Sequence, residues 1–330
     1  MKIAIIRLSA LGDIIQTAVV LQFIKKYVNN ASIDWFVDVR FKNILEKHHY
    51  IDNLYALPLK DKKYKECFNI LKNAKKNNYD LVIDFQGLIK SAFVSKMLSK
   101  NNFGFDKNSL KEDFASIFYK HKLNCSYDEN VFKRYFSLMN FALNLNLDFT
   151  LIYQKEAIFD NKKLEYLKLN EKNILFYTGS SQANKNYPKE KILKLCKLIL
   201  STYEKINIFF AWGSEDERQN AQYICSNIQS KRMYILDKLS LQDLIQLSNT
   251  MNLIIGNDSG TTHLAFAQNI ASITIFGATP SKRNALTTKI NKTIDANIQI
   301  NNAKRLDKND FCITNIDEND IFKIVKELLQ

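Results

Sequence analysis

Short apolar runs alternate with amphipathic stretches from the beginning of the chain. The runs are rich in Ile, Val, Leu and Phe, which is typical of buried strands, and predict strands at residues 2–7, 32–39, 54–57 and 80–85. Apolar residues at helical spacing predict helices at 13–27, 41–47, 64–76, 88–98 and 129–143, with a short helix at 112–119 inside an irregular segment, 106–122. This alternation indicates a parallel sheet with helices on both faces.

A polar stretch over residues 151–172 interrupts the pattern, which then restarts. The second half is expected to contain strands at 173–177, 206–211, 232–236, 252–256 and 272–276, and helices at 189–203, 215–228, 241–247, 261–267 and 317–329. The expected fold class is therefore α/β, with two doubly wound domains. They are residues 1–150 and 173–315, joined by a linker at 151–172, and the C-terminal helix in 316–330 is expected to pack back on the first domain. Two such domains facing across a cleft would each hold one ligand at the carboxyl ends of their strands.

The segment from Leu253 to Ala265 carries the strongest functional signal. Its apolar run breaks at Gly256 into Asp258-Ser259-Gly260-Thr261-Thr262-His263, and a helical pattern follows. The first N–H groups of a helix have no partners inside it and lie at the positive end of its dipole, so such a turn can hold a phosphate or diphosphate. Asp, Ser and Thr are also the preferred N-cap residues, so a capped helix without a ligand is the alternative.

The first strand-to-helix turn runs from Arg7 to Thr17 and contains Ser9, Gly12 and Asp13. It has one glycine rather than the three of a dinucleotide fingerprint, which speaks against a nicotinamide or flavin site. A carboxylate at a helix start stays ionised and can accept a proton from a substrate hydroxyl, so Asp13 is a candidate general base. The alternative for Asp13 is an ordinary helix cap.

Three further turns carry polar groups at strand ends. Their candidate residues are Gln86 and Lys90 after the strand at 80–85, Ser180, Ser181 and Lys185 after the strand at 173–177, and Glu215 after the strand at 206–211. Hydroxyls and a lysine suit phosphate oxygens, and a carboxylate at a strand end can accept hydrogen bonds from ribose. Each turn can also be read as helix-start chemistry, a polar loop or a solvated charge.

Composition narrows the function classes. The 330 residues carry a net charge of +13, and five widely spaced cysteines form no metal or disulfide spacing. No apolar run approaches a membrane span, no signal peptide is expected, and no arginine-rich arm or zinc-finger spacing supports nucleic-acid binding. No metal-ligand cluster is visible, and His48, His49 and His121 are expected on the surface. The positive charge suits an acidic substrate or an anionic lipid surface, and the general abundance of lysine is the alternative explanation.

Taken together, these segments resemble the ADP-heptose:lipopolysaccharide heptosyltransferases, inverting enzymes of the GT-B type. The similarity runs nearly end to end and is carried by the following segments: Arg7…Ser9-Ala10-Leu11-Gly12-Asp13; Asp84-Phe85-Gln86-Gly87-Leu88-Ile89-Lys90-Ser91-Ala92; Gly104-Phe105-Asp106…Lys111-Glu112…Ala115-Ser116-Ile117-Phe118-Tyr119; Asp258-Ser259-Gly260-Thr261-Thr262-His263; and Phe276-Gly277-Ala278-Thr279. The second and third of these segments are similar to the heptosyltransferase I branch. Lys111 stands where the family pattern leads us to expect an arginine, and Ser180-Ser181 and Ser259 stand where threonines are commoner.

The resemblance implies roles for the candidate residues. Asp13 would be the catalytic base. The donor-binding residues implied are Ser180, Ser181, Lys185, Glu215, Asp258, Ser259, Gly260, Thr261, Thr262 and His263, and the acceptor-binding candidates are Ser9, Gly12, Gln86, Lys60, Lys63, Lys90 and Lys111.

The implied reaction is transfer of L-glycero-D-manno-heptose from ADP-heptose to the Kdo of Kdo-lipid A, with inversion at the anomeric carbon. The alternative is heptosyltransferase II or another relative that uses the same donor. ADP-heptose is a substrate here, so no cofactor or metal is implied. The expected partners are ADP-heptose, Kdo-lipid A and an anionic membrane surface, and the expected location is cytoplasmic, peripheral at the inner membrane.

Overall fold

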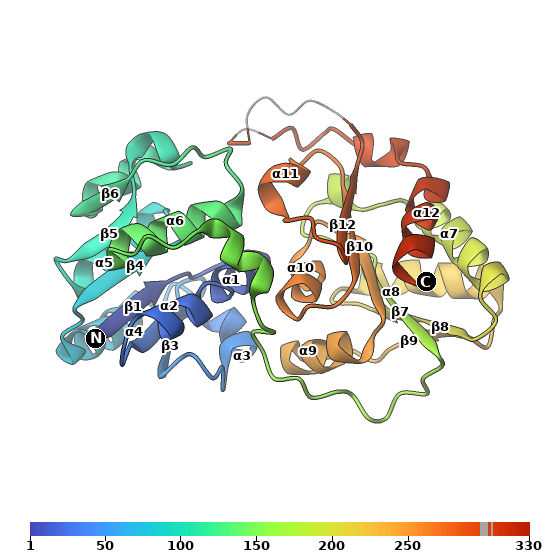
Figure 1. Ribbon diagram of the computed structural model, residues 1–330, viewed down its shortest axis with the longest axis horizontal. Helices are drawn as coiled ribbons and strands as arrows, with labels where there is room; N and C mark the ends of the chain where they lie inside the picture. Colours follow the sequence, from blue (N-terminus) through green and yellow to red (C-terminus); the bar gives the residue numbers. More distant parts are fainter. Residues whose placement is uncertain (298–302, 305) are drawn as a thin grey trace. The chain divides into compact units, whose positions relative to one another are not determined.

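The computed structural model describes residues 1–297, 303–304 and 306–330, and its chain divides into two units, Met1–Ile158 and Phe159–Gln330 (Figure 1). The division falls inside the predicted linker. Each unit contains a parallel sheet, as the alternating pattern predicted, and each sheet has six strands, where the sequence led us to expect four and five.

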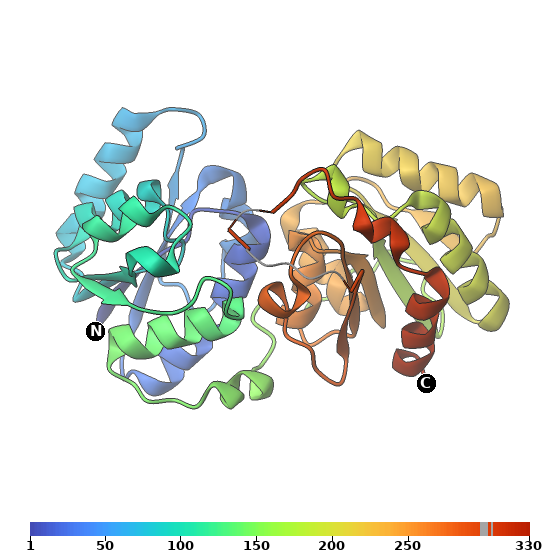
Figure 2. The same cartoon turned by 90° about the horizontal axis from the view of Figure 1, so that it is seen from above.

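The first sheet has the order β3-β2-β1-β4-β5-β6. Its strands are β1 (Lys2–Ile6), β2 (Ser32–Asp38), β3 (Asn53–Leu57), β4 (Leu81–Asp84), β5 (Asn102–Phe105) and β6 (His121–Leu123). Its helices are α1 (Leu11–Ala18), α2 (Leu21–Tyr27), α3 (Lys42–Leu45), α4 (Tyr64–Ala74), α5 (Ile89–Leu98) and α6 (Val131–Leu143). Short 3-10 helices are η1 (Val39–Phe41), η2 (Lys75–Asn77), η3 (Lys107–Ser109), η4 (Asp113–Phe118) and η5 (Phe149–Gln154). The order reverses beside β1, so α4 and α5 cover one face, and α2 and α6 lie on the other (Figure 2).

The second sheet has the order β12-β11-β10-β7-β8-β9. Its strands are β7 (Lys172–Tyr177), β8 (Ile206–Ala211), β9 (Met233–Ile235), β10 (Leu253–Asn257), β11 (Ser272–Phe276) and β12 (Asn291–Asp295). Its helices are α7 (Lys189–Thr202), α8 (Glu215–Ile228), α9 (Leu241–Thr250), α10 (Gly260–Ala267), α11 (Ser281–Asn284) and α12 (Glu318–Leu328), with 3-10 helices η6 (Ala183–Lys185) and η7 (Cys312–Asn315). The C-terminal helix α12 packs against α7, and its Ile321 and Val325 join the core of this unit. Its predicted packing on the first domain stays a prediction.

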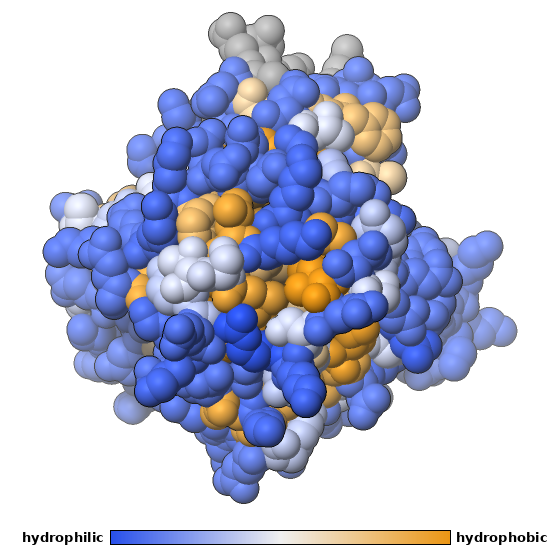
Figure 3. Space-filling view, turned by 90° about the vertical axis from the view of Figure 1, so that its right-hand side faces the viewer, coloured by the Kyte–Doolittle hydropathy of each residue, from blue (hydrophilic) through white to orange (hydrophobic). Residues whose placement is uncertain are grey.

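Apolar side chains pack between each sheet and the helices that cover it. In the second unit Ile174, Phe176, Ile208 and Phe210 are buried with the apolar face of α7. Figure 3 shows one face of this unit, on which apolar side chains gather among hydrophilic ones. Each fully buried side chain of this size contributes about 2 kcal/mol relative to an exposed one, so the apolar runs that identify the strands also stabilise them.

Several boundaries differ from the sequence expectation. The helix predicted at 13–27 is two helices, because a turn interrupts it, in which the Val20 N–H donates to the Thr17 carbonyl three residues earlier. Strands β5, β6 and β12 were not predicted, since they are short or polar. β6 and β12 lie at sheet edges, where a strand needs only one hydrogen-bonded neighbour and little apolar burial.

The prediction that His48 lies on the surface is wrong. Its side chain is buried, its Nδ1 lies 3.3 Å from the Tyr50 N–H, which it can accept, and its ring stacks on His49. Burial, with a smaller contribution from His49, lowers the pKa of His48 to about 3. His49 is exposed and His121 is half-buried, with its ring stacked on Phe103.

This buried histidine predicts a pH-dependent stability. Below the usual histidine pKa of about 6.5, the unfolded chain binds a proton that the folded chain does not, so stability should fall by about 1.4 kcal/mol per pH unit as the pH drops toward the folded pKa. Urea unfolding at pH 7 and pH 5 should show a loss about 2 kcal/mol smaller in a His48→Asn variant, whose amide oxygen can still accept the Tyr50 N–H. His49→Asn should keep most of the wild-type loss. An equal loss in wild type and His48→Asn would contradict the prediction.

Candidate active site

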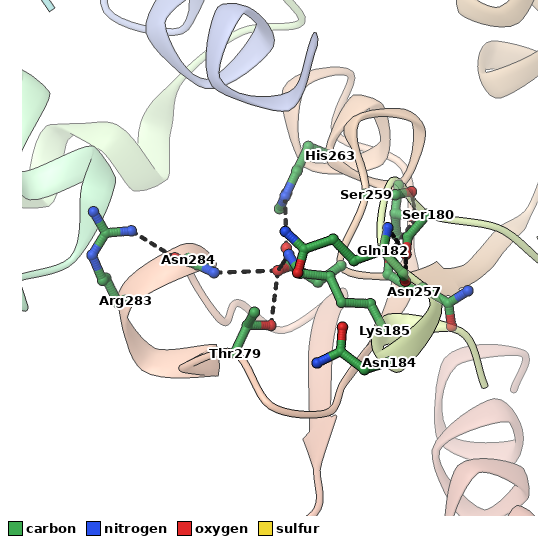
Figure 4. A network of polar contacts seen from close by, with 12 residues as sticks. Ser180, Gln182, Asn184, Lys185, Asn257, Ser259, His263, Thr279, Arg283 and Asn284 are labelled. Carbon is green, nitrogen blue, oxygen red and sulfur yellow. Dashed lines mark hydrogen bonds and ion pairs between the residues drawn. The ribbon is translucent and has the colours of Figure 1, made fainter. Parts of the chain in front are cut away.

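Asp258 forms the centre of a polar network at the carboxyl end of β10. Its carboxylate is buried, and Oδ2 accepts bonds from Lys185 Nζ at 2.9 Å, Thr279 Oγ1 at 2.9 Å and Asn284 Nδ2 at 3.2 Å. Oδ1 lies 3.3 Å from His263 Nε2 (Figure 4). Three of the predicted donor residues, Lys185, Asp258 and His263, are therefore in direct contact.

The network keeps Asp258 ionised. Burial alone would raise the pKa of Asp258, but the hydrogen bond from His263 and the charge of Lys185 outweigh it and hold the pKa well below its usual range. A buried carboxylate with an ion-pair partner and several donors is stable as an anion. Asp258 therefore fixes the position of Lys185 and His263.

The start of α10 is lined by hydroxyl groups. Ser259 is the N-cap residue but makes no side-chain capping bond, and its Oγ lies 3.1 Å from Thr261 Oγ1 and 3.2 Å from Thr262 Oγ1. The structure therefore does not show the side-chain-capped helix that was the alternative interpretation. Thr262 is buried and donates to the Asn257 carbonyl, which ties the helix start to the strand.

A glycine permits this close approach. A Cβ atom on Gly256 would lie 2.5 Å from Thr262 Oγ1 and 3.0 Å from Tyr177 Cβ. The side chain of Asn257 then joins two neighbouring loops, because it accepts the Tyr187 N–H and donates to the Thr178 carbonyl. β7, β10 and the turns that follow them are thus held together without an intervening side chain at position 256.

The loop after β7 brings Lys185 to Asp258. Ser180 is half-buried, donates to the Gln182 carbonyl and accepts the Gln182 N–H, while Ser181 is exposed. These contacts close a tight turn before η6, which carries Lys185 at its last position. Ser180 therefore shapes the loop, and Ser181 presents its side chain to solvent.

Glu215 opens α8 and is exposed, with an ion pair to Arg218 at 3.4 Å. The sequence pattern did not predict a role for a second carboxylate here, Glu217. Glu217 Oε2 accepts the Gly213 N–H at 2.7 Å, and its side chain lies against Gly179, where a Cβ would come within 2.1 Å of Glu217 Oε1. Glu217 therefore links the turn after β8 to the turn after β7.

Thr279, Arg283 and Asn284 were also not assigned a role from sequence. Thr279 follows β11, and Asn284 ends α11, a single turn of helix that the pattern did not reveal. Arg283 Nη1 donates to Asn284 Oδ1, and Asn284 in turn donates to Asp258 (Figure 4). The Gly-x-Thr turn in the sequence was the one signal that pointed to this side of the network.

In the first unit, the turn after β1 holds an ion pair. Arg7 is buried and its Nη2 lies 2.7 Å from Asp13 Oδ1, while its Nη1 donates to the Phe85 carbonyl. Burial would lower the pKa of Arg7, but the charge and hydrogen bond of Asp13, together with Tyr135 and Asp84, outweigh this effect and raise it. Asp13 lies two residues inside α1, with Gly12 before it, and its Oδ2 accepts the Ala10 N–H at 3.2 Å. Its side chain is 42% exposed, so an oriented carboxylate remains accessible to a substrate.

The turn after β4 adjoins the turn after β1. Gln86 Oε1 accepts the Leu8 N–H at 2.7 Å, and its Nε2 lies 3.4 Å from Ser9 Oγ. Asp84 is fully buried and accepts bonds from the Gln86 and Gly87 N–H groups and, at 2.6 Å, from the Tyr119 hydroxyl. Asp84 thus organises the turn and does not reach a substrate. Gly87 adopts a left-handed conformation with φ of 71°, which favours glycine.

The four predicted acceptor lysines, Lys60, Lys63, Lys90 and Lys111, are all exposed. Lys63 is the only one of these with an ion pair among the described residues, a long one to Glu66 at 4.0 Å. Their binding roles stay predictions.

Within the described part of the chain, no group of three or more His, Cys, Asp or Glu side chains could hold a metal ion. Of the helices that the structure describes, none has the length and apolar character needed to cross a membrane.

Comparison with known proteins identifies relatives over most of the chain. A sequence model of glycosyltransferase family 9 (heptosyltransferase) matches residues 67–313. The chain is 56% identical to lipopolysaccharide heptosyltransferase 1 of Campylobacter coli, with 99% of each chain covered, and 24% identical to that of Pseudomonas aeruginosa, with 84% of this chain and 79% of the relative covered. Among solved structures, Escherichia coli heptosyltransferase WaaC with ADP-2-deoxy-2-fluoro heptose has a TM-score of 0.79 at 21% identity, covering 99% of both chains. E. coli ADP-heptose LPS heptosyltransferase II has a TM-score of 0.75 at 16% identity, covering 100% of this chain and 99% of that one. These structural matches show that the fold is of the expected GT-B type.

Proposed function

Because the chain belongs to glycosyltransferase family 9, the heptosyltransferase family, we propose that it is a lipopolysaccharide heptosyltransferase I. The reaction is transfer of L-glycero-D-manno-heptose from ADP-heptose to the Kdo of Kdo-lipid A, with inversion at the anomeric carbon. The observation that carries this proposal is the 56% identity to lipopolysaccharide heptosyltransferase 1 over 99% of both chains.

The second unit is proposed to bind ADP-heptose. The start of α10 offers donors to the diphosphate through the hydroxyls of Ser259 and Thr261 and the backbone N–H groups of Gly260 to Thr262, since the Thr262 hydroxyl already donates to the Asn257 carbonyl. Lys185 supplies a positive charge that Asp258 holds in place at 2.9 Å. As the bond to the anomeric carbon breaks, negative charge builds on the leaving ADP, and preorganised donors stabilise it.

Other donor roles follow from position. His263 is oriented by Asp258 and can donate to a phosphate or a sugar hydroxyl. Asp258 Oδ1, which contacts His263 Nε2 at 3.3 Å, is proposed to accept a heptose hydroxyl as well, because three hydrogen-bond donors already occupy Oδ2. Ser180 and Ser181 lie in the loop after β7 that also carries Lys185, and are proposed to contact the diphosphate. Glu215 is exposed at the start of α8, where a carboxylate can accept bonds from the ribose.

Asp13 is proposed to act as the general base in the first unit. The ion pair to Arg7 and the Ala10 N–H orient its carboxylate, and its exposure leaves it accessible to a hydroxyl. Asp13 takes the acceptor proton as the hydroxyl attacks the anomeric carbon from the face opposite ADP. Ser9, Gly12, Gln86 and the four exposed lysines supply polar and cationic groups for the Kdo carboxylates and lipid A phosphates.

The acceptor is a lipid, so the enzyme is proposed to work at the cytoplasmic face of the inner membrane as a peripheral protein. Positive charge on the first half of the chain, +8 over residues 1–150, supports attraction to anionic lipid. ADP-heptose is a substrate, and the proposal includes no cofactor.

The acceptor assignment predicts a specific result in an ADP-release assay with ADP-heptose. Kdo-lipid A should support turnover, and the same acceptor already carrying the first heptose should not, because its Kdo hydroxyl is occupied. Kdo-lipid A with ADP-glucose serves as the donor control. Turnover on the heptosylated acceptor alone would instead assign the chain to heptosyltransferase II.

A further inference from the structure

Large apolar side chains are exposed in a group on the first unit. Six of them are between 41% and 62% exposed and lie on three elements: Tyr64 and Phe68 on α4, Ile89 and Phe93 on α5, and Phe114 and Ile117 on η4. Single exposed apolar residues are normal, whereas several large ones on neighbouring elements indicate an interaction surface. We call this set the α4–α5–η4 face.

These three elements are neighbours. α4 and α5 bury Leu71, Val94 and Leu98 in the same core cluster, so they cover the same face of the sheet (Figure 2). The Glu112 carboxylate, just before η4, accepts the Ile89 N–H at the start of α5.

Aromatic side chains continue this contact at the surface. The ring of Phe118 lies 6.3 Å from that of Phe93 and 6.4 Å from that of Phe114, so aromatic contacts run from α5 to η4. On α4 and on α5 the exposed pair is four residues apart, and on the 3-10 helix η4 it is three residues apart, so both members of each pair lie on one side of their helix.

The same elements carry most of the net positive charge. Residues 60–76, 89–100 and 107–120 contain 13 lysines and four carboxylates, a net charge of +9 out of +13 for the whole chain. Several of these lysines are exposed and lie close in sequence to the exposed apolar residues, namely Lys65, Lys72, Lys96 and Lys120. In the described part of the second unit, five large apolar side chains are more than a third exposed, and they lie on four separate segments: Tyr166 with Leu169, Tyr223, Ile290 and Phe311.

We propose that the α4–α5–η4 face binds an anionic lipid bilayer, with the aromatic and aliphatic side chains inserted and the lysines at the headgroups. Apolar residues and lysines on one surface match the two layers of an anionic membrane interface, the acyl boundary and the negative headgroups. A protein partner would need no such excess of lysine over carboxylate. The inference rests on the proposed function, in which the acceptor is a membrane lipid.

A tryptophan reporter tests where the bilayer contacts the protein. Phe114→Trp should show a blue-shifted emission with vesicles of phosphatidylethanolamine and phosphatidylglycerol, and quenching by brominated acyl chains. Tyr166→Trp, a similarly exposed aromatic position on the second unit, should show neither. A response at position 166 and none at position 114 would overturn the proposal.

Binding measurements test the energetics. Phe93→Ser with Phe114→Ser should weaken binding to the anionic vesicles by about tenfold or more, since both rings lose their apolar burial in the bilayer. The control pair Tyr166→Ser with Phe311→Ser should bind as the wild type does. Wild-type binding should weaken with added salt, which screens the attraction of lysines to anionic headgroups. It should also be weak on phosphatidylcholine vesicles, whose headgroups carry no net charge. Unchanged binding of the Phe93/Phe114 variant to the anionic vesicles would overturn the proposal.

Activity separates this inference from the proposed function. The Phe93/Phe114 variant should transfer heptose to an acyl-free, water-soluble Kdo acceptor at the wild-type rate, and more slowly to acceptor embedded in vesicles. Absence of transfer by the wild type to either acceptor would refute the proposed function alone, since vesicle binding is measured without substrate. Equal loss on both acceptors would overturn the membrane role of this face.

Discussion

Replacing Asp13 by Asn is expected to lower kcat for heptose transfer by about 10²- to 10⁴-fold, the usual contribution of a positioned general base. Asparagine keeps the shape of the side chain and can still accept from the Ala10 N–H, but it cannot take the acceptor proton. ADP binding, which the proposal assigns to the second unit, should be unchanged. Steady-state ADP release and calorimetric titration with ADP measure the two quantities.

Asp52 provides a matched control for this experiment. It lies in the same unit, is 43% exposed and pairs with Lys25 at 2.8 Å, whereas Asp13 is 42% exposed and pairs with Arg7 at 2.7 Å. Asp52→Asn should therefore leave kcat near the wild-type value. If Asp13→Asn retained more than about a tenth of wild-type kcat, Asp13 would be no more than a positioning residue.

The regular parts of the fold could be predicted because burial controls them. β8 and α8 have the predicted bounds, 206–211 and 215–228, since their apolar residues repeat at strand and helix spacing. β12, with the sequence Asn-Lys-Thr-Ile-Asp, has no such pattern. Its pairing with β11 comes from backbone hydrogen bonds and from the neighbouring strand, which a local pattern does not encode.

The candidate site could also be predicted only in part. Sequence could place Lys185 and Asp258 at the carboxyl ends of strands, because strand direction in a parallel sheet fixes that edge. It could not show that their side chains meet, since 73 residues separate them. Asn284 was out of reach for another reason: α11 is one turn long, too short to give a periodic signal.

Replacing Asp258 by Asn is expected to lower the free energy of unfolding by about 3 kcal/mol, because it leaves the Lys185 ammonium without its partner in a largely buried site. The fraction of activity lost should be large as well, since Lys185 and His263 lose the group that orients them. Urea unfolding and the KM for ADP-heptose measure the two effects. A double variant with Lys185→Gln should lose less than the sum of the two single variants, because the pair is already broken.

The pH dependence gives an independent readout of the same carboxylate. Its pKa in the folded chain lies below that in the unfolded chain, so its stabilisation is complete above about pH 4 and declines as the pH falls further. Asp258→Asn should lack this part of the acid sensitivity. Asp320→Asn is the control: its partner Lys323 lies 2.7 Å away, but both side chains are exposed to solvent, which screens the pair, so the expected change is much smaller than that of Asp258→Asn. Equal stability losses in the two variants would mean that the network around Asp258 contributes no more than a surface ion pair, and the depressed pKa would then lack its structural cause.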